Sequence, residues 1–183
     1  MTKEKELSTK KNPKKKKWII ASIIVLVIAI GGYITNMIID NRYSYEAKKF
    51  VKEHPEEAIA FAKKVDKIDY NIKKNFSSEA DVLATMNQMC HQKIVAKDKW
   101  GAVPMIPSTI NDIFQVVDRS DFETRTELLQ ILEKWLQGDF STVDRDHDYI
   151  LKLQNGSIGF SKGKATPEEE AQFILEHFGR DID

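Results

Sequence analysis

The sequence predicts an all-α protein: one N-terminal transmembrane helix followed by a compact helical-bundle domain outside the cytoplasm. Three observations predict this architecture. One uncharged apolar run near the N-terminus is long enough to cross a bilayer. In the rest of the chain, apolar residues recur at helical rather than strand spacing. Residues that begin and end helices separate these runs at short intervals.

Charge divides the chain into three parts. The 183 residues include 28 basic and 28 acidic residues, so the net charge is zero. Residues 1–17 have a net charge of +6, residues 18–39 have none, and residues 40–183 have −6. We therefore expect a basic cytoplasmic tail, a transmembrane helix and an extracytoplasmic helical domain, with 40–75 as a candidate membrane-proximal stalk. This distribution excludes a simple soluble cytoplasmic protein and a multi-spanning transporter, and the single cysteine excludes a disulfide scaffold.

The apolar run has the dimensions of a membrane span. It contains 22 residues, 17 of them apolar. At ~1.5 Å per residue, a helix of this length crosses a hydrocarbon core of ~30 Å with some tilt. We expect the run to be anchored at the inner interface by Trp18, Lys14, Lys15, Lys16 and Lys17. Because the lysines lie on one flank only, the tail should stay inside and the rest should be exported.

A cleaved signal peptide is the alternative interpretation of this run. Ala29-Ile30-Gly31 loosely fits a small-x-small cleavage site. The apolar core of a signal peptide is roughly 7–15 residues, however, and here apolar character resumes at Ile34 and continues to Ile39. The sequence therefore favours an uncleaved anchor. No cysteine follows the run closely, which excludes a lipoprotein anchor.

The expected partners follow from this placement. They are the lipid bilayer, anionic lipid headgroups at the basic tail, and an unknown envelope protein. Each juxtamembrane lysine contributes roughly 1 kcal/mol near anionic lipid. Nucleic acid is not expected, because the acidic domain would repel phosphate.

The first helices after the span are predicted from a proline and a capping pair. Residues 43–53 extend the membrane helix outward until His54-Pro55 interrupts it. A new helix should run from Pro55 to about Asn75, with an inward stripe of Ala58, Ile59, Ala62, Val65, Ile68 and Ile72. Ser78 with Asp81 should open the next helix, with a stripe of Val82, Met86, Met89, Cys90 and Ile94.

Four more helices are predicted after the connection at 100–107, where two prolines and a glycine prevent helix continuation. Their starts are marked by Thr109 with Asp112, Thr124 with Glu127, Ser141 with Asp144, and Thr166-Pro167 with Glu169. Their ends are marked for three of them by Gly138, Asn155-Gly156 and Gly179. Residues 158–165 are expected to hold a small β-turn or hairpin.

The run 144–148 is the most suggestive cluster for metal binding. Its alternating acids resemble the first half of an EF-hand loop, but Tyr149 replaces the required glycine and Asn155 the required glutamate. Acids are also common in the first turn of a helix, where they complement its dipole. We therefore expect no metal site and no cofactor; the candidate ligands are Asp144, Asp146, His147 and Asp148.

The histidines and the cysteine form no catalytic signature. The chain lacks HExxH, Cys-x-x-Cys, GxSxG, SxxK and P-loop motifs. Cys90 lies on an apolar stripe, and the adjacent His91 points ~100° away on a helix, so we expect a buried thiol rather than a nucleophile. Only a convergence of His91 and His147 with an aspartate would create a site.

The 100–107 connection is the candidate interaction surface. Trp100, Pro104 and Met105 would bind a partner if they were exposed on this loop. The alternative, which the sequence favours, is a plug in which Trp100 and Met105 fill the core. A second irregular segment, 155–164, has glycines that would let a partner backbone approach.

Several segments resemble a known family. They are CHQKIVAKDKWG at 90–101 with Pro104-Met105, GDFS at 138–141, DHD at 146–148, LQNG at 153–156 and PEEE at 167–170. These are similar to a family of uncharacterised single-pass membrane proteins of Bacillus-type Gram-positive bacteria, over roughly 76–178. The resemblance implies a membrane location and a helical fold, and it carries no activity.

Two functions are compatible with these observations. The first is a non-enzymatic interaction module at the cell envelope. The second is an envelope enzyme or metal-dependent binder that uses His91, His147 and the 144–148 cluster. If His91 and His147 lie far apart with no carboxylate between them, the second function loses its only support.

Overall fold

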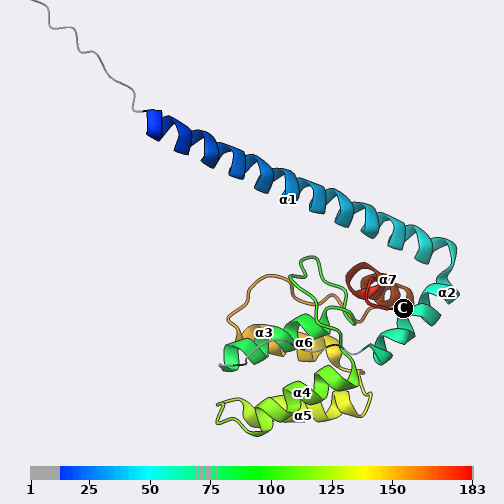
Figure 1. Ribbon diagram of the computed structural model, residues 1–183. Helices are drawn as coiled ribbons and strands as arrows, with labels where there is room; N and C mark the ends of the chain where they lie inside the picture. The colour runs from blue at the N-terminus through cyan, green and yellow to red at the C-terminus, as the bar shows by residue number, and fades with distance from the viewer. Residues whose placement is uncertain (1–12, 69, 71, 73–75, 77, 183) are drawn as a thin grey trace, which may run out of the picture. The chain divides into compact units, whose positions relative to one another are not determined.

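The computed structural model describes residues 13–182 except 69, 71, 73–75 and 77, with side chains from residue 22 onward. The chain divides into two compact units, Met1–Tyr45 and Glu46–Asp183. The described residues form seven α-helices and one 3-10 helix, with no β-strand among them (Figure 1). The predicted all-α class is confirmed.

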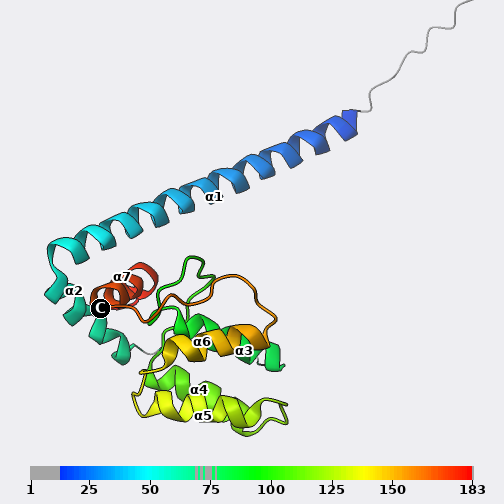
Figure 2. The same ribbon diagram turned by 180° about the vertical axis from the view of Figure 1, so that it is seen from behind.

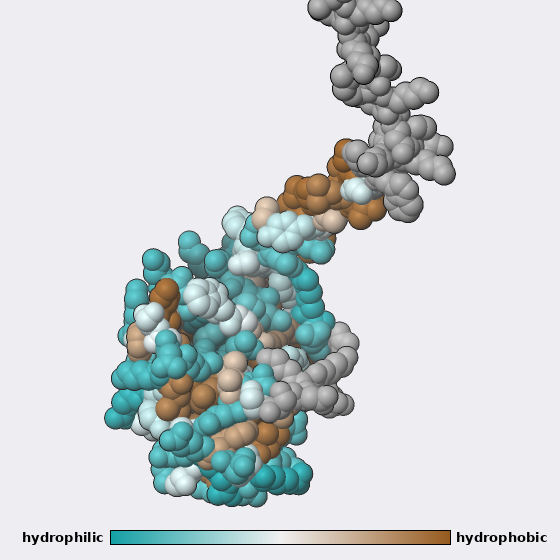
Figure 3. Space-filling model, turned by 90° about the vertical axis from the view of Figure 1, so that its left-hand side faces the viewer, coloured by the Kyte–Doolittle hydropathy of each residue, from teal (hydrophilic) through white to brown (hydrophobic). Residues whose placement is uncertain are grey.

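Helix α1, Pro13–Glu53, is one continuous helix of 41 residues. The part of α1 whose side chains are described, Ser22–Glu53, is long and apolar enough to cross a membrane, and none of its most apolar window is buried. Figure 3 shows this apolar surface as brown atoms exposed along the helix. The side chains of the predicted interfacial residues, Trp18 and Lys14 to Lys17, are not among those that the structure describes.

The second predicted helix is much shorter than expected. Helix α2 covers Pro55–Ala62 and is followed by the 3-10 helix η1, Lys63–Lys67. The prediction of a helix reaching Asn75 is wrong at Ile68, which is extended, and Asn75 itself lies outside the described residues. The reason is packing: Ile68 packs against one apolar core and Ile72 against the other. The chain therefore passes from one core to the other between these two residues.

The second unit contains these two cores. The larger core joins α3 (Glu79–Cys90), α4 (Pro107–Asp118), α5 (Arg125–Leu136) and α6 (Val143–Leu153). The smaller core joins the end of α1, α2, η1 and α7 (Pro167–Phe178). Figures 1 and 2 show the resulting pairs, α3 beside α6, α4 beside α5 and α2 beside α7.

The predicted helix starts are correct for α3 and α7. Ser78 Oγ accepts a hydrogen bond from the Asp81 amide, and Thr166 and Glu169 form a reciprocal capping box. Helix α4 begins at Pro107, two residues before Thr109, because proline suits the first helical turn. At α5, the Thr124 side chain does not cap; its amide and hydroxyl instead donate to Glu79 of α3.

The two irregular segments pair with each other. The Val95 amide donates to the Gly163 carbonyl at 2.9 Å, and the Lys162 amide donates to the Val95 carbonyl at 2.7 Å. Ile94 and Lys164 form an isolated antiparallel bridge. Residues 158–165 therefore contribute to a bridge with the segment after α3, rather than a hairpin of their own, and Ile94 is not on the helical stripe of α3.

Asp146 connects α5 and α6 inside the larger core. It is only 8% exposed. Its carboxylate accepts hydrogen bonds from Trp135 Nε1 at 3.0 Å, Lys134 Nζ at 2.7 Å and Thr142 Oγ1 at 3.2 Å. A buried carboxylate is tolerated when it is paired and hydrogen-bonded in this way.

Candidate functional site

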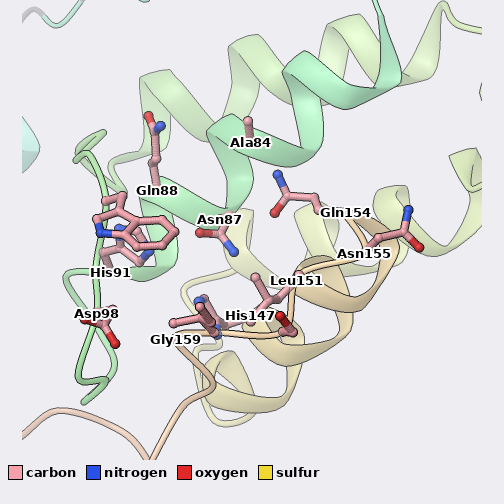
Figure 4. A pocket seen from close by; sticks show the side chains of 14 residues that line it. Ala84, Asn87, Gln88, His91, Asp98, His147, Leu151, Gln154, Asn155 and Gly159 are labelled. Atoms are coloured by element: carbon pink, nitrogen blue, oxygen red, sulfur yellow. The ribbon is translucent and has the colours of Figure 1, made fainter.

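A cavity of about 450 Å³ opens to solvent between α3, α6 and two loops. Figure 4 shows side chains from α3 and α6 projecting toward the same space. The α3 wall is formed by Ala84, Asn87, Gln88 and His91, and the α6 wall by His147, Leu151 and Gln154. The loop walls are formed by Asp98, Trp100, Asn155, Gly156, Ser157, Ile158 and Gly159.

Helical spacing explains why these side chains share one cavity. Asn87 and His91 are four residues apart, as are His147 and Leu151, so each pair lies on one face of its helix. The polar stripes of α3 and α6 face each other beside the apolar stripes that form the core. The cavity is therefore a polar extension of the α3–α6 packing.

His91 is a buried imidazole with a defined tautomer. It is 3% exposed, and its Nδ1 lies 2.8 Å from the Gly101 carbonyl oxygen. Because a carbonyl only accepts, Nδ1 carries the proton and Nε2 is the acceptor in the neutral ring. Burial lowers the pKa of His91 to about 4, so the ring is neutral at physiological pH.

His147 is arranged in the same way on the facing helix. It is 1% exposed, and its Nδ1 donates to Asp148 Oδ1 at 3.0 Å. Burial lowers the pKa of His147, although the Asp148 carboxylate acts in the opposite direction. The centroids of the two imidazole rings are 5.8 Å apart. The convergence of His91 and His147 with an aspartate, left open by the sequence, is therefore present.

Asn87 brings an unpaired donor to this pair. Among the described residues, Asn87 Nδ2 is the buried side-chain nitrogen that has no hydrogen-bond partner. A buried polar group without a partner costs about 1–3 kcal/mol. Native proteins retain such groups rarely, and a functional site is one of the places where they do.

The loop that carries Trp100 is held at several points. Lys99 Nζ donates to the carbonyls of His91 at 2.8 Å and Ile94 at 2.5 Å, and Gly101 accepts from His91. Gly101 has a φ of 82°, a conformation that favours glycine. Trp100 is nevertheless 73% exposed. The indole is therefore presented to solvent by a fixed backbone.

The plug predicted for the 100–107 connection is wrong for Trp100 and correct for Met105. Met105 is 2% exposed, and its amide donates to Gln92 Oε1 at 2.9 Å. Pro104 is also buried. Of the three predicted interaction residues, only Trp100 reaches solvent, because the loop turns inward after Gly101.

The second loop approaches the first closely at Gly159. This glycine has a φ of 91°, and a Cβ placed on it would lie 2.8 Å from the Asp98 carbonyl oxygen. On the same side, Asp148 Oδ1 accepts from the Ser161 amide at 2.8 Å. The glycines of 155–164 therefore allow the backbone of this loop to approach the backbone of the other loop of the same chain. This contact closes one wall of the cavity.

The predicted metal candidates do not form a cluster. Asp146 is engaged with α5, Asp148 with His147 and Ser161, and Asp144 lies in the first turn of α6. In the part of the chain that the structure describes, no group of three His, Cys, Asp or Glu residues could hold a metal ion. Cys90 is fully buried, and burial raises its pKa well above the ordinary value, as expected for a structural thiol.

Sequence reasoning missed the amides of the cavity, namely Asn87, Gln88, Gln154 and Asn155. Each is unremarkable by itself on a helix or at a helix end. The available signal was the polar stripe at Asn87, Gln88 and His91, which runs beside the apolar stripe of the same helix. This stripe lines a cavity only because a second stripe, on α6, faces it.

Comparison with known proteins finds a similarity to an uncharacterised family. No curated protein and no solved structure matches the chain. Residues 86–175 match a family described as a family of unknown function, DUF6241. This segment contains Asn87, His91, Trp100, His147 and both loops of the cavity. Over these residues the chain is therefore similar to an uncharacterised domain family. The matched segment lies within residues 76–178, where the sequence resembles a family of uncharacterised proteins.

Proposed function

We propose that this chain is a single-pass membrane protein whose helical domain is a non-enzymatic binding module at the outer face of a bacterial cell envelope, with the cavity as its binding site. One observation carries the binding proposal. Two buried neutral imidazoles and an unpaired Asn87 amide line a cavity that is open to solvent. A few well-placed polar groups on the wall of a preformed cavity fix the orientation of a ligand.

The placement in the envelope rests on the N-terminal part of the chain. The basic tail supports an inside location for the N-terminus, and α1 is long enough to span a bilayer. A signal sequence near the N-terminus would share this length and composition. The continuation of the apolar run to Ile39 within an unbroken helix favours the uncleaved anchor.

Protease added to intact protoplasts should test the topology. We expect the domain after residue 40 to be digested while the tail and anchor are protected, because the lysine cluster retains the tail inside. The digestion would be followed by mass spectrometry, with lysed protoplasts as the control. Protection of the domain would contradict the orientation, and a mature protein that begins near Gly32 would establish cleavage.

Ligand binding should be tested with the full chain in lipid nanodiscs, with its tryptophans labelled with fluorine. The label reports separately on exposed Trp100 at the cavity and on buried Trp135 in the core. In a screen of small polar compounds, we expect hits to shift the Trp100 resonance and leave that of Trp135 unchanged. Assignment by Trp100→Phe is the control. Hits that shift neither resonance, or a screen without hits, would contradict a binding module that uses this cavity.

A second candidate is an envelope enzyme in which His147 acts as a general base. The hydrogen bond from His147 Nδ1 to Asp148 favours it, because a carboxylate behind an imidazole orients the ring and leaves Nε2 to accept a proton. Turnover of a bound compound that is lost in His147→Gln would support this candidate. A metal-dependent binder has less support, since the two imidazoles fall short of the three protein ligands of a catalytic zinc site.

A further inference from the structure

We infer that the ligand of this cavity is an uncharged, amide-bearing sugar residue of an oligosaccharide, held in the cavity by Asn87, His91 and His147 and stacked at the rim on Trp100. This inference rests on the proposed function, since it names the ligand class of the same site. It follows from the charge of the walls, from their donors and acceptors, and from the position of the exposed indole.

The charge of the walls disfavours an anionic ligand. No Lys or Arg is among the described residues that line the cavity, and Asp98 is the carboxylate on its wall. Lys99, which lies between Asp98 and Trp100 in sequence, is engaged elsewhere: its ammonium group donates to the carbonyls of His91 and Ile94 and lies 5.0 Å from the Phe173 ring centroid. A phosphate or a carboxylate would therefore be desolvated here without a counter-charge.

The polar groups of the walls suit a ligand that both donates and accepts. The two imidazoles offer Nε2 as acceptors, because their Nδ1 atoms already donate to Gly101 and Asp148. Asn87 Nδ2 offers a buried donor. A sugar hydroxyl can do both, and an acetamido group presents a carbonyl to Asn87 and an N–H to an imidazole. Such a group would satisfy the buried donor that the protein leaves unpaired.

The exposed indole supplies the apolar contact that a sugar ring requires. Sugar rings carry C–H groups on their faces, and these pack against an aromatic plane by dispersion. Trp100 is exposed, and the backbone beside it is held by the contacts of Lys99 and Gly101, so little further ordering of the loop is needed on binding. This arrangement suits an oligosaccharide of which one sugar residue enters the cavity beside Asn87, while the oligosaccharide packs on Trp100 at the rim.

A cationic ligand is the rival class, since an ammonium group could lie over Trp100 and beside Asp98. The two classes differ in what they require of the deep wall. A cation could donate to the imidazole Nε2 atoms, but it has no acceptor for the unpaired donor Asn87 Nδ2, which an acetamido carbonyl would satisfy. Two probes with the same sugar backbone can therefore separate them.

The experiment uses the full chain in nanodiscs and titration calorimetry with three trisaccharides. The first is the trimer of N-acetylglucosamine, which is neutral and carries amides. The second is its deacetylated form, which is cationic, and the third is maltotriose, which is neutral without amides. We expect the N-acetylated trimer to bind at least ten-fold more tightly than either of the others.

Variants connect the binding to the cavity. Asn87→Leu and Trp100→Ala should each weaken binding of the N-acetylated trimer at least ten-fold. Neither variant should melt below the wild type: Trp100 is mostly exposed, and Asn87→Leu removes an unpaired buried donor, which raises the melting temperature. Leu136→Ala, another exposed apolar residue on α5, is the matched control and should bind as wild type.

The outcomes separate the ligand class from the binding function. Tighter binding of the deacetylated trimer, or equal binding of maltotriose, would overturn the sugar class proposed here while leaving a binding cavity. Binding of the N-acetylated trimer that survives both Asn87→Leu and Trp100→Ala would place the ligand elsewhere and overturn the inference. Absence of binding by all three trimers would also overturn it, and the compound screen would then decide the proposed function independently.

Discussion

Replacing Asp146 with Ala is expected to lower the free energy of unfolding by about 3–5 kcal/mol. The carboxylate is buried between α5 and α6, and its removal leaves the Trp135 indole N–H without an acceptor in the core. It also leaves the Lys134 ammonium group without its counter-charge. The loss should appear as a lower urea midpoint of the full chain in detergent micelles, followed by tryptophan fluorescence in a Trp18→Phe, Trp100→Phe background that leaves Trp135 as the reporter.

Two further variants make this result specific. Asp146→Asn keeps an oxygen that can accept from Trp135, so its loss should be about half as large. Asp144→Ala removes a neighbouring acid that contributes only through the helix dipole, and it should cost less than about 1 kcal/mol. Equal effects of Asp144→Ala and Asp146→Ala would show that the buried network does not hold α5 and α6 together.

Stability should also fall steeply under mild acid because of His91. Its pKa is lowered from 6.5 to about 4 in the folded protein, mainly by burial, so the unfolded state binds more protons between these values. The contribution of neutral His91 is therefore complete above pH 6.5 and is lost as the pH falls toward 4. Linkage gives a loss of about 2 kcal/mol between pH 7.5 and 5. His147 and His177, whose pKa values are also lowered, act in the same direction.

Urea unfolding of the full chain at both pH values measures this loss. His91→Gln is the control, because an amide can still donate to the Gly101 carbonyl but does not titrate. The variant should lose about 2 kcal/mol less than wild type over the same interval. An identical pH dependence in the two proteins would mean that His91 is not kept neutral by the fold.

Local rules predicted most of the helical architecture. The proline after His54, the Ser78 cap and the Thr166-Pro167-Glu169 start each act within one turn of helix, so sequence alone locates them. The same rules failed after Ala62, where Ile68 and Ile72 follow a helical period but pack on two different cores. That outcome is decided by tertiary packing, about which the local spacing of apolar residues carries no information.

The candidate site depended on contacts that are distant in sequence. His91 and His147 were named as a pair whose convergence would matter, but their approach requires α3 to pack on α6. Trp100 is exposed on a loop in which the adjacent Lys99 donates to the backbone carbonyls of His91 and Ile94. The composition of the 100–107 connection favours a buried Trp100. Its exposure becomes visible only with the hydrogen bonds that the neighbouring residues make.

The smaller core has a consequence for the order in which the domain is completed. Its early part, Ala47, Val51, Ala58 and Val65, packs with Ala171, Ile174 and Phe178 of α7, more than a hundred residues later. During synthesis, these early apolar residues emerge long before their partners. They must therefore remain without their native neighbours, exposed to chaperones and proteases, until α7 has been made. A ribosome that stalls before residue 167 would release a chain whose larger core can close but whose smaller core cannot.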